Sequence, residues 1–191
     1  VEALRQRGAV MLQGDLDARA ASQDEMPEVA GRLDEDFRQS LAVLPLAARL
    51  SLDEVEVVAF HGELSDGSPL FNENPRLAAE LHVISRYAVE LETLDEGSLF
   101  EVLAEHLSAD VYVFGHAQRA MSRHLGGKQF VGVPSAGRPR GDVRTGYALL
   151  TAQEGELRVE FRKVAYDVQA AVRAIKAHGF PRHFAQELQS P

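Results

Sequence analysis

The sequence contains no cysteine and no tryptophan, and only 7% of its 191 residues are aromatic. Without cysteine the chain cannot form disulfides, thiolate metal sites or a cysteine nucleophile. Any metal must therefore be held by histidine, carboxylate or amide side chains. The scarcity of aromatic residues also argues against a base-stacking surface of the kind that binds single-stranded nucleic acid.

Long apolar runs and an excess of basic residues are absent as well. No run approaches the roughly 20 apolar residues that a membrane-spanning helix requires, and the opening residues VEALRQRGAV lack the pattern of a secretory signal. We therefore expect a cytoplasmic protein that does not enter a membrane. With 20 Lys and Arg against 29 Asp and Glu, the formal net charge of -9 opposes binding to nucleic acid or to an anionic membrane surface.

The apolar and charged fractions, 45% and 26%, are those of an ordinary globular domain. Since no linker rich in Pro, Gly or Ser interrupts the sequence, we expect residues 1–191 to form a single domain. Val1 stands in the middle of a helical pattern, without a Met or an N-cap residue before it. This start predicts a domain that is truncated at its N-terminus.

Helix and strand patterns alternate along the chain, which favours an α/β fold. Apolar positions three or four residues apart predict helices over 1–7, 27–44, 76–92, 99–107 and 167–175, and a last short helix after Pro181. Apolar or alternating runs predict strands over 9–13, 47–52, 55–60, 110–115, 129–133, 146–152 and 156–161. The last two strands are expected to form an antiparallel hairpin. Loops are expected over 63–75, 115–127 and 134–144.

Three of the predicted strands end in a glycine next to a potential metal ligand. These ends are Gly14-Asp15-Leu16-Asp17, Phe60-His61-Gly62 and Gly115-His116-Ala117-Gln118. Because open α/β folds bind ligands at the carboxyl ends of their strands, such side chains can converge on one divalent cation. A second interpretation stays open: a histidine at a strand end is often structural, and Asp-x-Asp often forms an Asx turn or a helix cap.

The segment VYVFGHAQRAMSRHLGGKQFVGVPSAGRPRGDVRTGYALL resembles the C-terminal part of the calcineurin-like metallophosphoesterases, in particular their small bacterial and archaeal branch. In that family a strand ends in Gly-His-Thr-His, and an Asn-Pro-Gly-Ser loop and a Pro-Arg follow. Upstream, VMLQGDLD is similar to the family strand that precedes Gly-Asn-His-Asp, and VVAFHGEL is similar to its His-Gly ligand loop. The resemblance extends over residues 1–166.

The resemblance implies an α-β-β-α sandwich of two mixed sheets with helices outside. It also implies that the leading βαβ portion is lacking, because the family motifs Asp-x-His and Gly-Asp-x-x-Asp do not occur before the first strand. Removing two central strands would expose apolar surface and an open sheet edge. Either a longer protein supplies the missing strands, or another chain covers the gap, which leaves a homo-oligomer open.

The resemblance also implies roles for individual residues. Asp15 takes the place of an asparagine ligand, and with His61 and His116 it would hold the second of two metal ions. Gln118 replaces the histidine that binds the first ion, and Leu16 replaces the histidine that contacts the phosphate. A guanidinium group suits bidentate contact with phosphate, so Arg119 beside the ligand loop is a candidate for substrate binding. Arg138 and Arg140 are weaker candidates, since most arginines of an acidic protein are solvated.

In this family, water activated between two metal ions hydrolyses a phosphoester. The resemblance therefore implies a metal-dependent phosphoesterase, or phosphatase, that acts on a small phosphorylated substrate, either a monoester or a diester. The ligand types suit Mn, Fe, Ni or Zn, and the surviving residues suit one ion rather than two. The substitutions at Leu16 and Gln118 support an alternative, a degenerate member that binds a metal, nucleotide or protein without turnover. The sequence identifies no catalytic residue.

Overall fold

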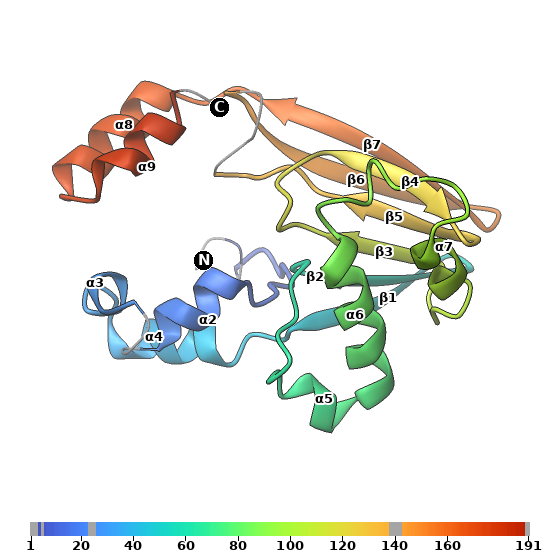
Figure 1. The fold of residues 1–191 in the computed structure, drawn as a ribbon. Coiled ribbons are helices and arrows are strands. Elements are labelled where there is room, and N and C mark those ends of the chain that lie inside the picture. The colour runs from blue at the N-terminus through green and yellow to red at the C-terminus, as the bar shows by residue number, and fades with distance from the viewer. Residues whose placement is uncertain (1–3, 5, 23–25, 138–142, 190–191) are drawn as a thin grey trace.

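The computed structural model describes residues 4, 6–22, 26–137 and 143–189. Its central sheet has five strands in the order β1-β2-β3-β5-β4, and β6 and β7 form a second, antiparallel sheet (Figure 1). The strands are β1 (Ala47–Leu52), β2 (Val55–Phe60), β3 (Val111–Phe114), β4 (Met121–Leu125), β5 (Lys128–Gly132), β6 (Thr145–Gln153) and β7 (Glu156–Val164). The predicted α/β class with two sheets is confirmed.

The helices of the described chain are short, apart from two. They are α2 (Asp15–Ala21), α3 (Pro27–Ala30), α4 (Glu35–Ala42), α5 (Leu70–Glu73), α6 (Pro75–Tyr87), α7 (Leu99–Ala104), α8 (Val168–Ala177) and α9 (Arg182–Glu187). Helices α8 and α9 pack against each other through a small apolar cluster, and Figure 1 shows this pair beyond the end of β7. Within the described residues, no helix has both the length and the apolar character needed to cross a bilayer.

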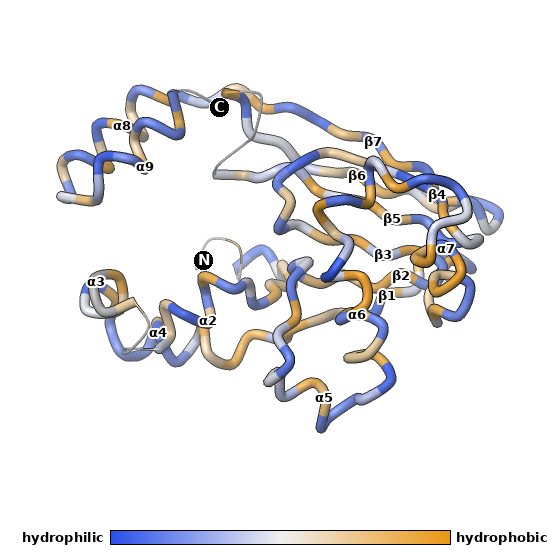
Figure 2. Tube along the Cα trace, viewed as in Figure 1, coloured by the Kyte–Doolittle hydropathy of each residue, from blue (hydrophilic) through white to orange (hydrophobic). Residues whose placement is uncertain are grey.

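The central sheet is covered on both faces. On one face, apolar side chains of β2, β3, β4 and β5 pack against helices α6 and α7 in a cluster that includes Leu81 and Phe100. On the other face, Val57, Val111 and Val131 pack against the second sheet. Hydrophobic and hydrophilic residues alternate along β7, as expected for a strand with one packed face (Figure 2). Because β2 and β3 are buried on both faces, their sequences are almost wholly apolar.

Strands β2 and β3 are parallel, and their register runs from Val57 beside Val111 to Phe60 beside Phe114. The parallel arrangement requires a long crossover, which α5, α6 and α7 provide. Both strands therefore end at the same edge of the sheet. The residues that follow them, His61 and Gly115, remain joined there, because the Gly115 amide donates a hydrogen bond of 2.8 Å to the His61 carbonyl oxygen.

A polar cluster lies between α6 and the sheet. The Glu80 side chain is buried, and its Oε2 accepts hydrogen bonds from the Tyr112 hydroxyl at 2.7 Å and the Ser108 hydroxyl at 2.8 Å. The Tyr112 oxygen in turn accepts one from the Ala109 amide at 3.1 Å. Burial raises the pKa of the Tyr112 hydroxyl to about 12. The tyrosine therefore remains a neutral donor to the carboxylate at ordinary pH.

Several predicted elements differ in the structure. The strand expected over 9–13 is wrong: this segment has no strand partner among the described residues, and Val10 is 69% exposed. The helix expected over 27–44 is divided into α3 and α4, because the chain turns at Gly31 and begins a new helix at Asp34, whose carboxylate accepts a hydrogen bond from the Phe37 amide. Most of the helix expected over 1–7 lies outside the described residues.

The loop expected over 115–127 contains strand β4, which pairs antiparallel with β5. Polar residues occupy its middle positions and only its two ends are buried, so its apolar signal is weak. The glycines Gly126 and Gly127, both with positive φ, form the turn of this hairpin. The loop expected over 63–75 likewise contains the short helix α5, and the helix expected over 76–92 ends at Tyr87.

Candidate metal centre

Two histidines follow the adjacent parallel strands of the central sheet. His61 comes directly after β2, and His116 comes two residues after the end of β3. Because the register places Phe60 beside Phe114, the two imidazoles reach the same edge of the sheet. Their ring centroids lie 5.5 Å apart and their planes are nearly perpendicular, at 82°. The main-chain pairing of β2 and β3 thus brings together two residues that are 55 positions apart in the sequence.

Asp15 reaches this edge from a different part of the chain. It is the first residue of α2, and its carboxylate oxygen Oδ1 lies 2.7 Å from Nε2 of His61. The second aspartate of the motif, Asp17, has a different role, because its Oδ2 accepts a hydrogen bond of 2.9 Å from the Gly14 amide at the start of the helix. The two interpretations of the Asp-x-Asp motif therefore each describe one aspartate: Asp17 caps the helix, and Asp15 faces the histidines.

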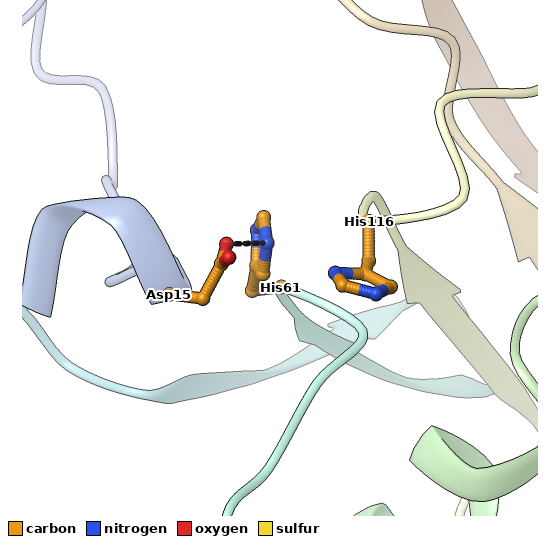
Figure 3. Close-up of side chains that lie close together, drawn as sticks. All are labelled: Asp15, His61 and His116. Atoms are coloured by element: carbon orange, nitrogen blue, oxygen red, sulfur yellow. Dashed lines mark ion pairs between the residues drawn. The ribbon is translucent and has the colours of Figure 1, made fainter. Parts of the chain in front are cut away.

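Asp15, His61 and His116 together form a half-buried cluster in which one potential ligand atom from each residue lies within 4.8 Å of the others (Figure 3). Atoms that bind one ion at about 2.1 Å lie roughly 3 to 4 Å from one another. Small side-chain movements would therefore let all three residues share one ion. Two imidazoles and one carboxylate are ligands suited to Zn, Mn, Fe or Ni. The residues present fit a single divalent cation.

Glycines permit the close approach of these segments. Gly62 has a φ of +112°, and a Cβ atom at this position would lie only 2.8 Å from the Cβ of His116. A Cβ at Gly14 would lie 3.1 Å from Nδ1 of His61. Side chains at either position would therefore push against the candidate ligands. The Gly-Asp and His-Gly pairs at Gly14-Asp15 and His61-Gly62 are thus explained by the limited space beside the candidate ligands.

The loop after β3 has an unusual backbone. His116 and Gln118 have φ values of +43° and +58°, in the left-handed region that residues other than glycine rarely adopt. The side-chain oxygen Oε1 of Gln118 is buried and accepts no hydrogen bond within the described structure. A buried carbonyl oxygen left in this state costs about 1–3 kcal/mol. Such strained and unsatisfied groups are concentrated at functional sites in proteins.

The candidate ligands lie in an open cleft of about 460 Å³, which Leu16, Gln118 and Arg119 also line. The Arg119 side chain is 58% exposed, and its guanidinium lies 3.7 Å from a carboxylate oxygen of Glu92. An exposed pair of this kind contributes little to stability, so the guanidinium remains available to another anion. Arg138 and Arg140, the weaker candidates for phosphate contact, lie outside the described residues.

The structure adds Glu63 to the surroundings of the cluster. Its Oε2 lies 3.6 Å from Nδ1 of His116. This separation is longer than a hydrogen bond, so the Glu63 carboxylate adds negative charge beside the cluster and does not hold the imidazole in place. The sequence held one signal for this residue, which is its position immediately after His61-Gly62. The cleft also receives Val89 from the turn after α6, and no sequence motif pointed to that residue.

Known structures are similar to this chain in fold, whereas comparison of sequences finds no match. No protein-family model matches the chain, and no curated protein matches it. A hypothetical protein from Pyrococcus horikoshii OT3 has a similar structure, with 16% identity and a TM-score of 0.66 over 98% of this chain and 75% of that one. A metallophosphoesterase from Sphaerobacter thermophilus is similar with 15% identity and a TM-score of 0.66, over 99% of this chain and 80% of that one. The predicted metallophosphoesterase-like fold is therefore confirmed at the level of fold.

Proposed function

We propose that the protein is a metal-dependent phosphoesterase that hydrolyses a small phosphomonoester or phosphodiester. The observation that carries this proposal is the convergence of Asp15, His61 and His116 on one cleft at the carboxyl edge of β2 and β3. The fold adds support, because the similar structure from Sphaerobacter thermophilus is that of a metallophosphoesterase.

In this proposal the three clustered side chains hold one divalent cation, of which manganese, iron, nickel and zinc are all compatible with the donors. The chemistry supplied by a cation in such a site is activation of water and neutralisation of charge on phosphoryl oxygens. Gln118 contributes its amide oxygen as a further ligand, which would remove the cost of leaving that oxygen unsatisfied. Glu63 adds negative charge beside His116, which favours a bound cation.

Arg119 has a separate role, which is to bind the phosphate of the substrate. Its exposed guanidinium stands at the same cleft and can turn from Glu92 toward phosphoryl oxygens. The planar fork of the side chain presents two N–H groups to two oxygens of one phosphate. Arg119 would therefore fix the orientation of the substrate while the clustered ligands hold the cation.

A second candidate function is metal binding without turnover. Leu16 places an apolar side chain in the cleft, beside Asp15, where a catalytic histidine would be expected by resemblance. In addition, Asp15, His61 and His116 form the one cluster of at least three potential His or carboxylate ligands found among the described residues. A site limited to one ion would retain affinity for the metal and lose much of the stabilisation that a second ion supplies.

A manganese titration combined with an activity assay separates these proposals. Isothermal titration calorimetry of the purified, metal-stripped chain should show one bound Mn²⁺, and the His61→Ala variant should lose it. His106→Ala is the matched control, since His106 is exposed and lies outside the cleft. Hydrolysis of an aryl phosphate monoester or diester that requires Mn²⁺ and His61 would support the phosphoesterase. Binding without turnover across such substrates would favour the second candidate, and absence of Mn²⁺ binding would contradict both.

A further inference from the structure

The cleft around the candidate metal centre has an apolar wall. Leu16 and Val89 line it although they are 56% and 62% exposed, and Ala117, Val133 and Pro134 line it as well. Single exposed apolar side chains are ordinary features of a protein surface. Here, however, five apolar residues from separate parts of the chain line the same cleft as the candidate metal ligands. This arrangement offers a polar corner for a phosphoryl group and an apolar surface beside it.

We infer that the cleft selects phosphoesters whose ester group is apolar, an aryl or branched alkyl group, over those with a hydroxyl-rich group such as glycerol or a sugar. The inference rests on the proposed function, since it assumes that the phosphoryl group lies at Asp15, His61 and His116. An apolar ester group covering Leu16 and Val89 would remove their exposed surface from water, which is favourable. A hydroxyl-rich group in the same place would lose hydrogen bonds to water without replacement.

Apart from Gln118, whose amide oxygen is assigned above to the cation, the described polar groups of the cleft give hydroxyl groups few alternatives. The Ser135 hydroxyl already accepts a hydrogen bond of 3.3 Å from the Gly137 amide, and the Ser135 carbonyl oxygen accepts one of 3.1 Å from the Thr145 hydroxyl. Arg119 has a charge that suits an anion rather than a neutral hydroxyl. The polar groups of the cleft therefore match the phosphoryl end of a ligand, and the remaining surface matches an apolar end.

The apolar wall is also held in place. Leu16 follows Asp15 on α2, so the candidate ligand and the wall residue are adjacent on one helix. Val89 lies in the turn after α6, and Arg123 anchors that turn by donating hydrogen bonds of 2.9 Å to the carbonyl oxygens of Leu91 and Glu92. A wall formed before the ligand arrives costs less ordering on binding. The volume of about 460 Å³ is within the range of roughly 300–1,000 Å³ typical of small-molecule sites.

Two phosphonates that resist hydrolysis test this inference by binding alone. Calorimetry with the Mn²⁺-loaded chain should show that 1-naphthylphosphonate binds at least roughly tenfold more tightly than 2,3-dihydroxypropylphosphonate, because only the former covers the apolar wall without leaving hydroxyl groups unpaired. In Leu16→Asn and Val89→Asn, naphthylphosphonate should bind roughly fivefold more weakly, and dihydroxypropylphosphonate should not bind more weakly. Val102→Asn is the matched control, since Val102 is 51% exposed on α7 and does not line the cleft.

The outcomes distinguish this inference from the proposed function. Equal affinity for the two phosphonates, equal weakening of both ligands in the variants, or binding of neither ligand would overturn the apolar ester group as the basis of selection. Metal binding and Mn²⁺-dependent hydrolysis of glycerol phosphate could persist in each of these cases, and the phosphoesterase proposal would then stand. Failure of the manganese titration described above would instead overturn the proposed function.

Discussion

Gly62 is the position at which a single methyl group should disturb the candidate metal centre most directly. Its φ of +112° is strained for alanine, which alone costs about 1–3 kcal/mol. The new Cβ would lie 2.8 Å from the Cβ of His116, whereas carbon atoms in contact prefer roughly 3.5–4.0 Å. His116 would therefore have to move by roughly 1 Å. Metal ligands tolerate displacements of only about 0.2 Å, so Gly62→Ala should lower Mn²⁺ affinity roughly 10- to 100-fold.

The assay pairs calorimetric Mn²⁺ titration with thermal unfolding of the metal-free chain. The melting temperature of Gly62→Ala should fall by roughly 2 to 4 °C for each kcal/mol of strain. Gly67→Ala is the matched control in the same loop, because a Cβ there meets no atom within 4 Å, and it should leave metal affinity and stability nearly unchanged. Wild-type Mn²⁺ affinity in Gly62→Ala would show that His116 does not act as a ligand from its observed position, and would refute the reasoning.

Three further predictions concern parts of the chain around the cleft. Tyr112→Phe should lower the free energy of unfolding by about 1–3 kcal/mol in urea denaturation at pH 7, because Glu80 loses a buried donor. The pKa of Tyr112 is raised from about 10 in an unfolded chain to about 12 in the folded one. This contribution should therefore be intact below pH 10 and lost as the pH rises toward 12. Parallel plots of unfolding free energy against pH for the wild type and Tyr112→Phe would contradict this. Arg123→Ala should cost about 1–3 kcal/mol in the same assay and weaken naphthylphosphonate binding, because the turn carrying Val89 loses its anchor; unchanged binding would argue against a preformed wall. Asp34→Ala should cost about 1 kcal/mol by removing the cap of α4, and any loss of Mn²⁺ affinity in this variant would contradict a purely local role.

The buried strands and the residues after them were predictable from sequence because their signals are local. The segments that became β2 and β3 are almost wholly apolar, and each is followed by histidine and glycine in opposite order. The helical patterns between them are those of a crossover connection, which parallel strands require. The convergence of Asp15, His61 and His116 was an expectation about strand ends, and the structure brings these three side chains together.

Other features depended on tertiary structure that no local pattern reveals. Asp15 faces the histidines from the first turn of a helix, whereas the preceding strand expected over 9–13 did not form. Glu63 and Val89 reach the site through loop paths. Glu63 has one sequence signal, its position after His61-Gly62, and Val89 has none. Strand β4 was missed because its middle residues are polar and only its pairing with β5 defines it.

The parallel register of β2 and β3 has a consequence for how this protein can change. The two imidazoles are kept as neighbours by main-chain pairing from Phe60 beside Phe114, not by attraction between their rings. Exchanges of one apolar residue for another within these strands would leave that spacing intact. Inserting a single residue into β3 would instead turn every later side chain to the opposite side of the layer and carry His116 away from His61. Many apolar exchanges within β2 and β3 can therefore accumulate while His61 and His116 stay side by side, whereas the insertion of one residue would separate them.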